Sequence, residues 1–112
     1  GLIVSNHGGR QLDAAPTAVS VLPGIRRALG PDVLIAADGG IRSGLDAARL
    51  LALGADFVLI GRPFIFASAA MGAPGGDHLI TVLKAELSGT MAQLGCRTVA
   101  ELPSFLYAPN EG

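Results

Sequence analysis

The sequence predicts an α/β fold in which three short strands alternate with helices. Three nearly continuous apolar runs, residues 2–5, 33–37 and 57–60, have the length and composition of strands buried on both faces. Each run is followed by a glycine-bearing loop and then by a segment with apolar residues at helical spacing. Strands that alternate with helices form a parallel sheet with right-handed crossovers, and such a sheet is covered by helices.

The first two helices are expected between the strands. One covers residues 17–29, and Pro23 starts or kinks its main part because proline lacks the donor that the preceding turn requires. The other begins at Ser43, a natural N-cap, and ends at Gly54.

Two further helices are predicted after the third strand, over residues 63–71 and 77–94, with a loop at 73–76 between them. The second of these has an apolar stripe that we assign to core packing, and His78 near its start is expected at the surface. Residues 104–112 are expected to form a weakly ordered tail.

The placement of polar residues favours part of an eight-stranded barrel over an open sheet. Each informative polar cluster follows the C-terminal end of a strand: His7 with Arg10, then residues 38–43, then Gly61 with Arg62. Loops at that end form the catalytic face of a (β/α)8 barrel, and those after the last two strands commonly hold a phosphate. We therefore predict the last three βα units of a TIM barrel with additional C-terminal helices, and a chain that is a fragment of a longer protein.

Length and composition restrict the class of protein. The 112 residues are 50% hydrophobic and 15% charged, which is typical of a well-buried domain, and we place that domain at residues 1–103. No apolar run approaches the roughly 18 residues of a transmembrane helix. The net charge of −1 excludes the electrostatic footprint of a nucleic-acid-binding protein. The single cysteine, Cys96, fits a reducing compartment, so we expect a cytoplasmic protein, and no residue is assigned to a metal.

Residues 5–13, Ser-Asn-His-Gly-Gly-Arg-Gln-Leu-Asp, are the most informative stretch of the chain. The His7 imidazole can accept a proton near neutral pH, and the Arg10 guanidinium can hold a carboxylate through two parallel hydrogen bonds. Gly8 and Gly9 let the backbone turn sharply and approach a ligand. A histidine alone more often marks a strand end and a solvated turn, but the whole string indicates a site for a substrate that bears a carboxylate.

Two later segments predict a phosphate site. Residues 38–44, Asp-Gly-Gly-Ile-Arg-Ser-Gly, lead into a helix N-terminus, where backbone N–H groups, the helix dipole and Arg42 favour an anion. Residues 61–63, Gly-Arg-Pro, repeat the arrangement at the next strand end. Either segment alone fits a tight turn with its arginine in solvent, whereas the pair on adjacent strands indicates a shared phosphate cradle. Neither matches the Walker GxxxxGK[ST] or the Rossmann GxGxxG pattern, which disfavours ATP hydrolysis and nicotinamide binding.

Together these motifs resemble the C-terminal third of the FMN-dependent α-hydroxy-acid oxidase and dehydrogenase family, which includes glycolate oxidase, L-lactate dehydrogenase and oxidase, and mandelate dehydrogenase. The resemblance runs from residue 1 to about residue 103. It implies that His7 is the base that takes a proton from the substrate while two electrons pass to flavin N5, and that Arg10 binds the substrate carboxylate. It also implies that FMN is held at the three strand ends, by Ser5, Asp38, Gly39, Gly40, Ile41, Arg42, Gly61 and Arg62.

The resemblance further implies oxidation of an L-2-hydroxy acid of the lactate, glycolate or mandelate type to the 2-keto acid. Oxygen, a quinone or a cytochrome would be the electron acceptor, and homotetramers are usual for the family. Its substrate tyrosines, its flavin-polarising lysine and the aspartate that pairs with the base would lie upstream of residue 1, as would the segment that attaches some members to the inner membrane. Tyr107 matches none of these, and Asp13 is better explained as a structural residue of its turn than as the partner of His7. The chain alone is therefore expected to be inactive.

Two other interpretations stay open. The chain could belong to another FMN- or phosphate-binding barrel, such as type 2 isopentenyl-diphosphate isomerase or inosine-monophosphate dehydrogenase, which share a glycine-rich loop after strand seven but lack the His-Gly-Gly-Arg turn. It could also be a non-catalytic half-barrel that binds a phosphate ligand or assembles with a partner chain.

Overall fold

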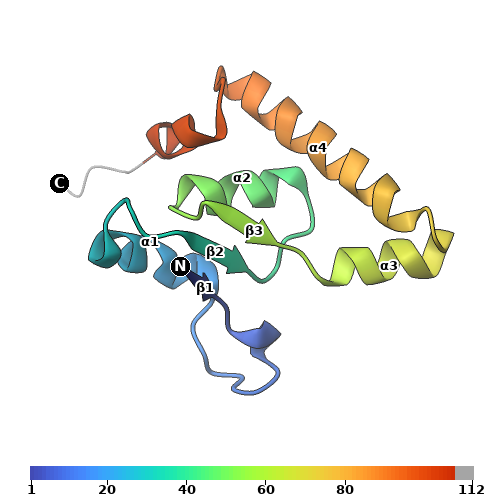
Figure 1. Ribbon diagram of the computed structural model, residues 1–112, viewed down its shortest axis with the longest axis horizontal. Coiled ribbons are helices and arrows are strands. Elements are labelled where there is room, and N and C mark those ends of the chain that lie inside the picture. The colour runs from blue at the N-terminus through green and yellow to red at the C-terminus, as the bar shows by residue number, and fades with distance from the viewer. Residues whose placement is uncertain (108–112) are drawn as a thin grey trace.

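A computed structural model describes residues 1–107, and at its centre is a parallel sheet of three strands (Figure 1). The strands lie in the order β1 (Leu2–Val4), β2 (Ile35–Asp38) and β3 (Phe57–Leu59). Val4 pairs with Ala37, and Asp38 pairs with Leu59. Because the strands are parallel and end side by side, the loops that follow them open at one edge of the sheet.

Helices connect and extend the strands. The helical segments of the described chain are η1 (His7–Gly9), α1 (Ala18–Leu29), α2 (Gly44–Ala52), α3 (Arg62–Met71), α4 (Gly75–Leu94) and η2 (Val99–Phe105), where η denotes a 3₁₀ helix. The order of the three strands and of helices α1 to α4 is the one that the sequence predicted, whereas the short helices η1 and η2 were not predicted. The Thr17 hydroxyl caps α1 by accepting a hydrogen bond from Ser20 N, and the Ser43 hydroxyl caps α2 by accepting one from Asp46 N.

Some boundaries differ from the prediction. Strand β2 begins at Ile35 and includes Asp38, so the carboxylate sits at the very end of the strand. Helix α1 runs through Pro23 without interruption. Helix α4 begins at Gly75, inside the stretch expected to be a loop, because Gly75 packs directly on the backbone of α3: a Cβ there would collide with Ala67.

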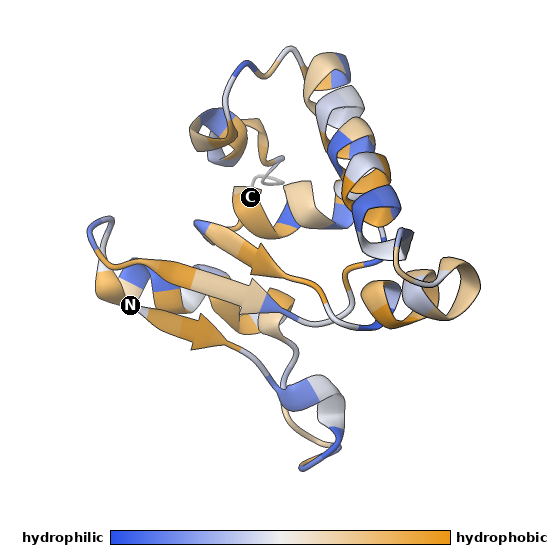
Figure 2. Cartoon of the chain, turned by 45° about the vertical axis from the view of Figure 1, so that its right-hand side comes forward, coloured by the Kyte–Doolittle hydropathy of each residue, from blue (hydrophilic) through white to orange (hydrophobic). Residues whose placement is uncertain are grey.

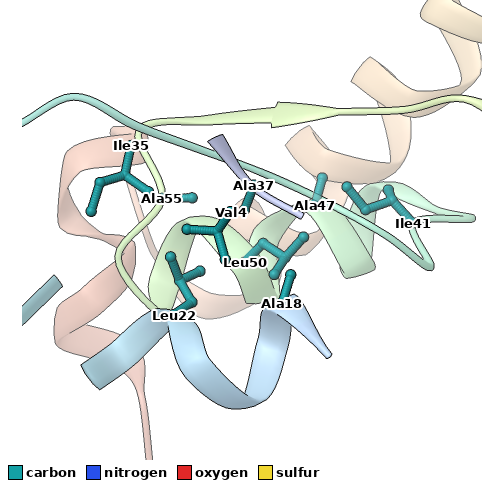
Figure 3. Close-up of a cluster of buried hydrophobic side chains, with 9 residues drawn as sticks. All are labelled: Val4, Ala18, Leu22, Ile35, Ala37, Ile41, Ala47, Leu50 and Ala55. Carbon is teal, nitrogen blue, oxygen red and sulfur yellow. The ribbon is translucent and has the colours of Figure 1, made fainter. Parts of the chain in front are cut away.

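The main core lies between the sheet and helices α1 and α2 (Figure 3). Leu22 from α1, Ile35 from β2 and Leu50 from α2 are almost fully buried in it. Complete burial of side chains of this size contributes roughly 1.5–3 kcal/mol each. This cluster holds the strands, and therefore the loops at their ends, in fixed positions.

A second cluster, Ala48, Leu51, Cys96 and Leu102, lies between α2 and the C-terminal helices. Leu87 and Met91 of α4 pack against it, whereas Ile80 and Leu94 of the predicted stripe are exposed, so only part of that stripe is core.

Helix η2 crosses the boundary that we expected at residue 103. It includes Ser104 and Phe105 of the predicted tail, because buried Leu102 anchors it to α2. Residues 108–112 of that tail lie outside the described residues. His78 is exposed, as predicted.

The two outer strands of the sheet are strongly hydrophobic (Figure 2), and they carry exposed apolar side chains. Ile3 on β1 is 60% exposed, and Phe57 on β3 is 58% exposed. Parallel strands are normally covered on both faces and paired at both edges, so this exposure is what part of a larger barrel presents. Among the described helices, none has the length and apolar character needed to span a membrane.

Candidate functional site

The loops after the three strands surround one open hollow of about 360 Å³, at the lower end of the usual range for ligand pockets. Nine of the ten site residues predicted from the sequence line this hollow. They run in sequence from His7 and Arg10, after β1, to Gly61 and Arg62, after β3. Ser5 is the exception. The C-terminal edge of the sheet therefore gathers residues that are 55 positions apart in the sequence.

The turn that carries His7 is held by the two residues before it. The Ser5 Oγ atom accepts a hydrogen bond from His7 N at 3.1 Å, and Asn6 Oδ1 accepts one from Gly8 N at 3.0 Å. His7 has a φ of +56°, in the left-handed region that non-glycine residues rarely adopt. Such a conformation persists only where neighbouring contacts impose it, and it occurs often at functional sites.

Sequence reasoning assigned no role to Asn6, which holds its own turn and lies beside the loop after β2. Its Oδ1 atom lies 3.9 Å from the position that a Cβ on Gly39 would take. An asparagine directly before a tight turn is a common former of such side-chain-to-backbone bonds, and this was the signal available in the sequence.

Asp38 contributes an unpaired acceptor to the wall of the hollow. Its Oδ1 atom is buried and has no hydrogen-bond partner among the described residues. A buried carboxylate oxygen without a partner is costly, so this position fits a hydrogen-bond donor supplied by a ligand, such as a hydroxyl group.

The backbone beside Asp38 is open to a ligand. Gly40 has a φ of +75°, and a Cβ on Gly40 or on Gly61 would meet no protein atom within 4 Å. The exposed side chains of Arg42 and Arg62 line the same part of the hollow. Open glycine backbone between two guanidinium groups is an arrangement that binds a phosphate.

The start of α2 differs from the sequence prediction, which gave its positive end to an external anion. Gly44 N donates to Glu86 Oε2 at 2.6 Å, and Arg42 N donates to Asp46 Oδ2 at 3.0 Å. The hydrogen bond from Arg42 N is the main reason that the pKa of Asp46 lies below its ordinary value; Ser43 and Arg49 lower the pKa further, and partial burial opposes them. These donors are therefore used within the protein.

The N-terminus of helix α3 differs from that of α2. Its N-cap, Gly61, makes no side-chain capping bond, and Pro63 occupies its first turn.

Sequence reasoning missed the capping role of Glu86 at the start of α2. Glu86 lies 42 residues after Gly44, the glycine that it caps, on a helix that was assigned to packing alone.

The remaining candidates lie away from this centre. Asp13 is exposed between η1 and α1 and does not line the hollow, and Tyr107 is 88% exposed. Within residues 1–107, no group of three or more histidine, cysteine, aspartate or glutamate residues is arranged to hold a metal ion.

Comparison with known proteins gives consistent results. The sequence profile of the FMN-dependent dehydrogenases matches residues 1–108. An L-lactate oxidase from Alicycliphilus denitrificans is 47% identical over 110 residues, which cover 98% of this chain and 30% of that protein. An L-lactate dehydrogenase from Xanthomonas campestris pv. campestris is 49% identical over 102 residues, which cover 91% of this chain and 26% of that protein.

Solved structures agree in fold. Mandelate oxidase with benzoyl-formic acid superposes with a TM-score of 0.88 and 43% identity, covering 91% of this chain and 30% of that one. A mandelate oxidase variant with a monooxide FMN adduct gives 0.86 and 43%, covering 89% and 32%. The chain thus spans about 30% of the length of the relatives it matches, and its three βα units form part of a TIM barrel, as the sequence predicted.

Proposed function

The chain belongs to the FMN-dependent dehydrogenase family, and from this premise we propose that it is the C-terminal part of an enzyme that oxidises an L-2-hydroxy acid to the 2-keto acid. Its relatives are named for oxidation of L-lactate and mandelate, which share a carboxylate next to a secondary alcohol. The observation that carries the proposal is the single hollow that joins a histidine and an arginine to two further arginines and open glycine backbone.

His7 and Arg10 form the substrate end of the proposed site. Arg10 binds the carboxylate through two hydrogen bonds and so fixes the adjacent C–OH group. His7 accepts one proton from the substrate as a general base. The oxidation removes two protons and two electrons in total: His7 takes one proton, and the electron pair would pass with the other proton to bound flavin. The imidazolium that forms needs a negative partner, which the family resemblance places upstream of residue 1.

The residues at the other end of the hollow fit FMN. The unpaired Asp38 Oδ1 suits a ribityl hydroxyl, and the open backbone at Gly40 and Gly61, with Arg42 and Arg62, suits the phosphate. Ile41 is 2% exposed, so it contributes backbone and not side chain. Bound there, FMN supplies the acceptor for the two electrons. Ser5 Oγ accepts from His7 N, which leaves its hydroxyl proton for a flavin acceptor.

We place the complete protein in the cytoplasm as a homotetramer, with oxygen, a quinone or a cytochrome as electron acceptor. Two observations support assembly and a reducing compartment. Phe66 on α3 is 60% exposed, which provides apolar contact area, and Cys96 is a free, buried thiol.

The test uses the complete polypeptide that contains this segment. Its visible spectrum is recorded, and L-lactate, glycolate and L-mandelate are added without oxygen. Bleaching of a bound flavin by at least one of them is expected. A bound flavin that no hydroxy acid reduces would instead indicate another FMN-binding barrel, and absence of flavin would indicate a non-catalytic phosphate-binding protein.

A further inference from the structure

Helix α4 packs against α2, and one hydrogen bond joins it to the start of α2, beside the proposed cofactor site. Figure 1 shows α4 running diagonally above α2, and where the two helices approach each other Gly44 N donates to Glu86 Oε2 at 2.6 Å. A carboxylate that accepts from the first turn of a helix forms a short, charge-assisted hydrogen bond and interacts favourably with the helix dipole.

The contact requires a glycine at residue 44. Gly44 is buried, and a Cβ on it would lie 2.6 Å from Glu86 Cβ and would also collide with Leu87 N. Leu87 and Met91, one and five residues further along α4, pack on the second hydrophobic cluster. The backbone of α4 is therefore held at the point where Glu86 reaches α2.

Gly44 lies two residues after Arg42, so its position sets the end of the loop that borders the hollow. Arg42 N donates to Asp46 Oδ2, and Asp46 N donates to Ser43 Oγ at 3.2 Å. Three side-chain oxygens thus accept hydrogen bonds from the backbone N–H groups of residues 42, 44 and 46. Glu86 is the only one of the three that comes from another helix, and it connects the loop to the rest of the fold.

We propose that Glu86 is a positioning residue for the flavin phosphate: by capping α2 at Gly44 it fixes residues 38–42 so that the open backbone at Gly40 and the Arg42 side chain face the phosphate. This inference rests on the proposed function, because it concerns the same hollow. Glu86 itself does not line the hollow, so it acts through the loop and not by touching the cofactor.

Binding of FMN and of riboflavin to the complete apoprotein separates positioning from general stability. Riboflavin lacks the phosphate, so loss of positioning changes the ratio of the two dissociation constants, whereas a general loss of stability weakens both. Flavin fluorescence gives both constants. Glu86→Ala is expected to weaken FMN at least tenfold and riboflavin less than threefold, and Glu86→Gln, which keeps an acceptor at the same place, is expected to stay within threefold of wild type for FMN.

Glu101 provides the matched control. Its Oε2 atom also accepts from a backbone N–H, that of Arg97 at 3.0 Å, but in a part of the chain that does not line the hollow. Glu101→Ala is expected to leave the ratio unchanged. A ratio within twofold of wild type in Glu86→Ala, or equal losses in Glu86→Gln and Glu86→Ala, would overturn the inference.

Two further outcomes are informative. If Glu86→Ala does not fold, Glu86→Asp withdraws the acceptor by one methylene and is expected to lower the FMN preference at least threefold, and an unchanged preference would overturn the inference. Wild-type protein that binds no FMN would refute the proposed function itself, which is a different result from bound FMN that is insensitive to residue 86.

Discussion

The guanidinium of Arg26 donates to the Asp56 carboxylate at 2.6 Å, and the same carboxylate oxygen accepts from Ile35 N at 2.8 Å. Arg26 also donates to three backbone carbonyls, those of Gly30, Val33 and Gly54. This one side chain therefore joins the end of α1 to the segments that enter β2 and β3. It braces the sheet at the end opposite the hollow.

Removal of the Arg26 side chain should destabilise the fold without altering the site. Arg26→Ala leaves three carbonyls without this donor and the Asp56 carboxylate without its ion-pair partner, and we expect a loss of about 2–3 kcal/mol in the free energy of unfolding. Arg27→Ala, at the exposed neighbouring position, should change it by less than about 0.5 kcal/mol. Urea unfolding of the complete protein measures both, and equal effects would contradict the role given to Arg26.

The same bond network predicts a pH dependence of stability. The hydrogen bond from Ile35 N, with Arg26 adding to it and burial opposing it, places the pKa of Asp56 below its ordinary value. A carboxylate whose pKa is lower in the folded state stabilises the fold above its unfolded pKa of about 3.9. That contribution disappears as the pH falls through the folded pKa. In Asp56→Asn the unfolding free energy should therefore decrease less steeply than in wild type as the pH falls below about 4. An unchanged slope in this pH range would contradict the role given to Asp56.

Substitution of Gly44 tests the close approach of α2 and α4. Gly44→Ala places a Cβ against the backbone of α4, and we expect it to cost roughly 1–3 kcal/mol as an overpacked position. Gly89→Ala is the matched control, because Gly89 lies in α4, the helix that Gly44 contacts, a Cβ there meets nothing within 4 Å, and alanine improves helix propensity by up to about 1 kcal/mol. Thermal unfolding should thus shift in opposite directions for the two variants. An unchanged melting temperature in Gly44→Ala would mean that α2 and α4 can move apart without loss of stability.

Replacement of Arg10 should affect the substrate and spare the cofactor. Loss of a bidentate, charged contact to a carboxylate is expected to lower kcat/KM roughly 10²-fold in Arg10→Ala, with FMN affinity unchanged. Arg10→Lys should recover only part of this, since a lysine presents no planar fork. Steady-state kinetics with the best hydroxy acid and flavin titration provide the two readouts. A variant that loses FMN instead would place Arg10 in the cofactor half of the hollow.

The 112-residue chain by itself should not catalyse the reaction. Its sheet exposes Ile3 on β1 and Phe57 on β3, and its hollow is open to solvent. We expect no tight FMN binding and no bleaching of added FMN by L-lactate without oxygen. Bleaching by the purified chain alone would show that all groups needed for catalysis lie within residues 1–112.

Sequence reasoning predicted which residues meet at this edge of the sheet better than it predicted the contacts that support them. His7, Asp38 and Gly61 follow three apolar runs, and the ends of neighbouring parallel strands necessarily meet, so the sequence was enough to bring them together. The expectation for the start of α2 was incomplete, because the group that binds there is distant in the sequence. A local pattern shows a helix end with free donors, but the Glu86 acceptor arrives from a helix whose crossing is decided by packing.

Contacts between residues far apart in the sequence also explain two other features that the sequence did not predict. The Arg26–Asp56 pair spans 30 residues and has no local signal. Helix η2 extends beyond residue 103 because Leu102 is buried against α2, and a short segment with a proline inside it gives little local indication of such a contact.

The most direct test of the account is the rate at which a hydroxy acid reduces the bound flavin in the His7→Gln variant of the complete protein. The variant is mixed with L-lactate, glycolate or L-mandelate without oxygen, and flavin absorbance is recorded over time. Glutamine keeps a polar side chain of similar size but does not accept a proton near neutral pH. We predict that the variant retains its flavin and that reduction slows by about 10²- to 10⁴-fold, the usual contribution of a general base. Reduction at the wild-type rate, with flavin bound, would contradict the assignment of the base to this chain.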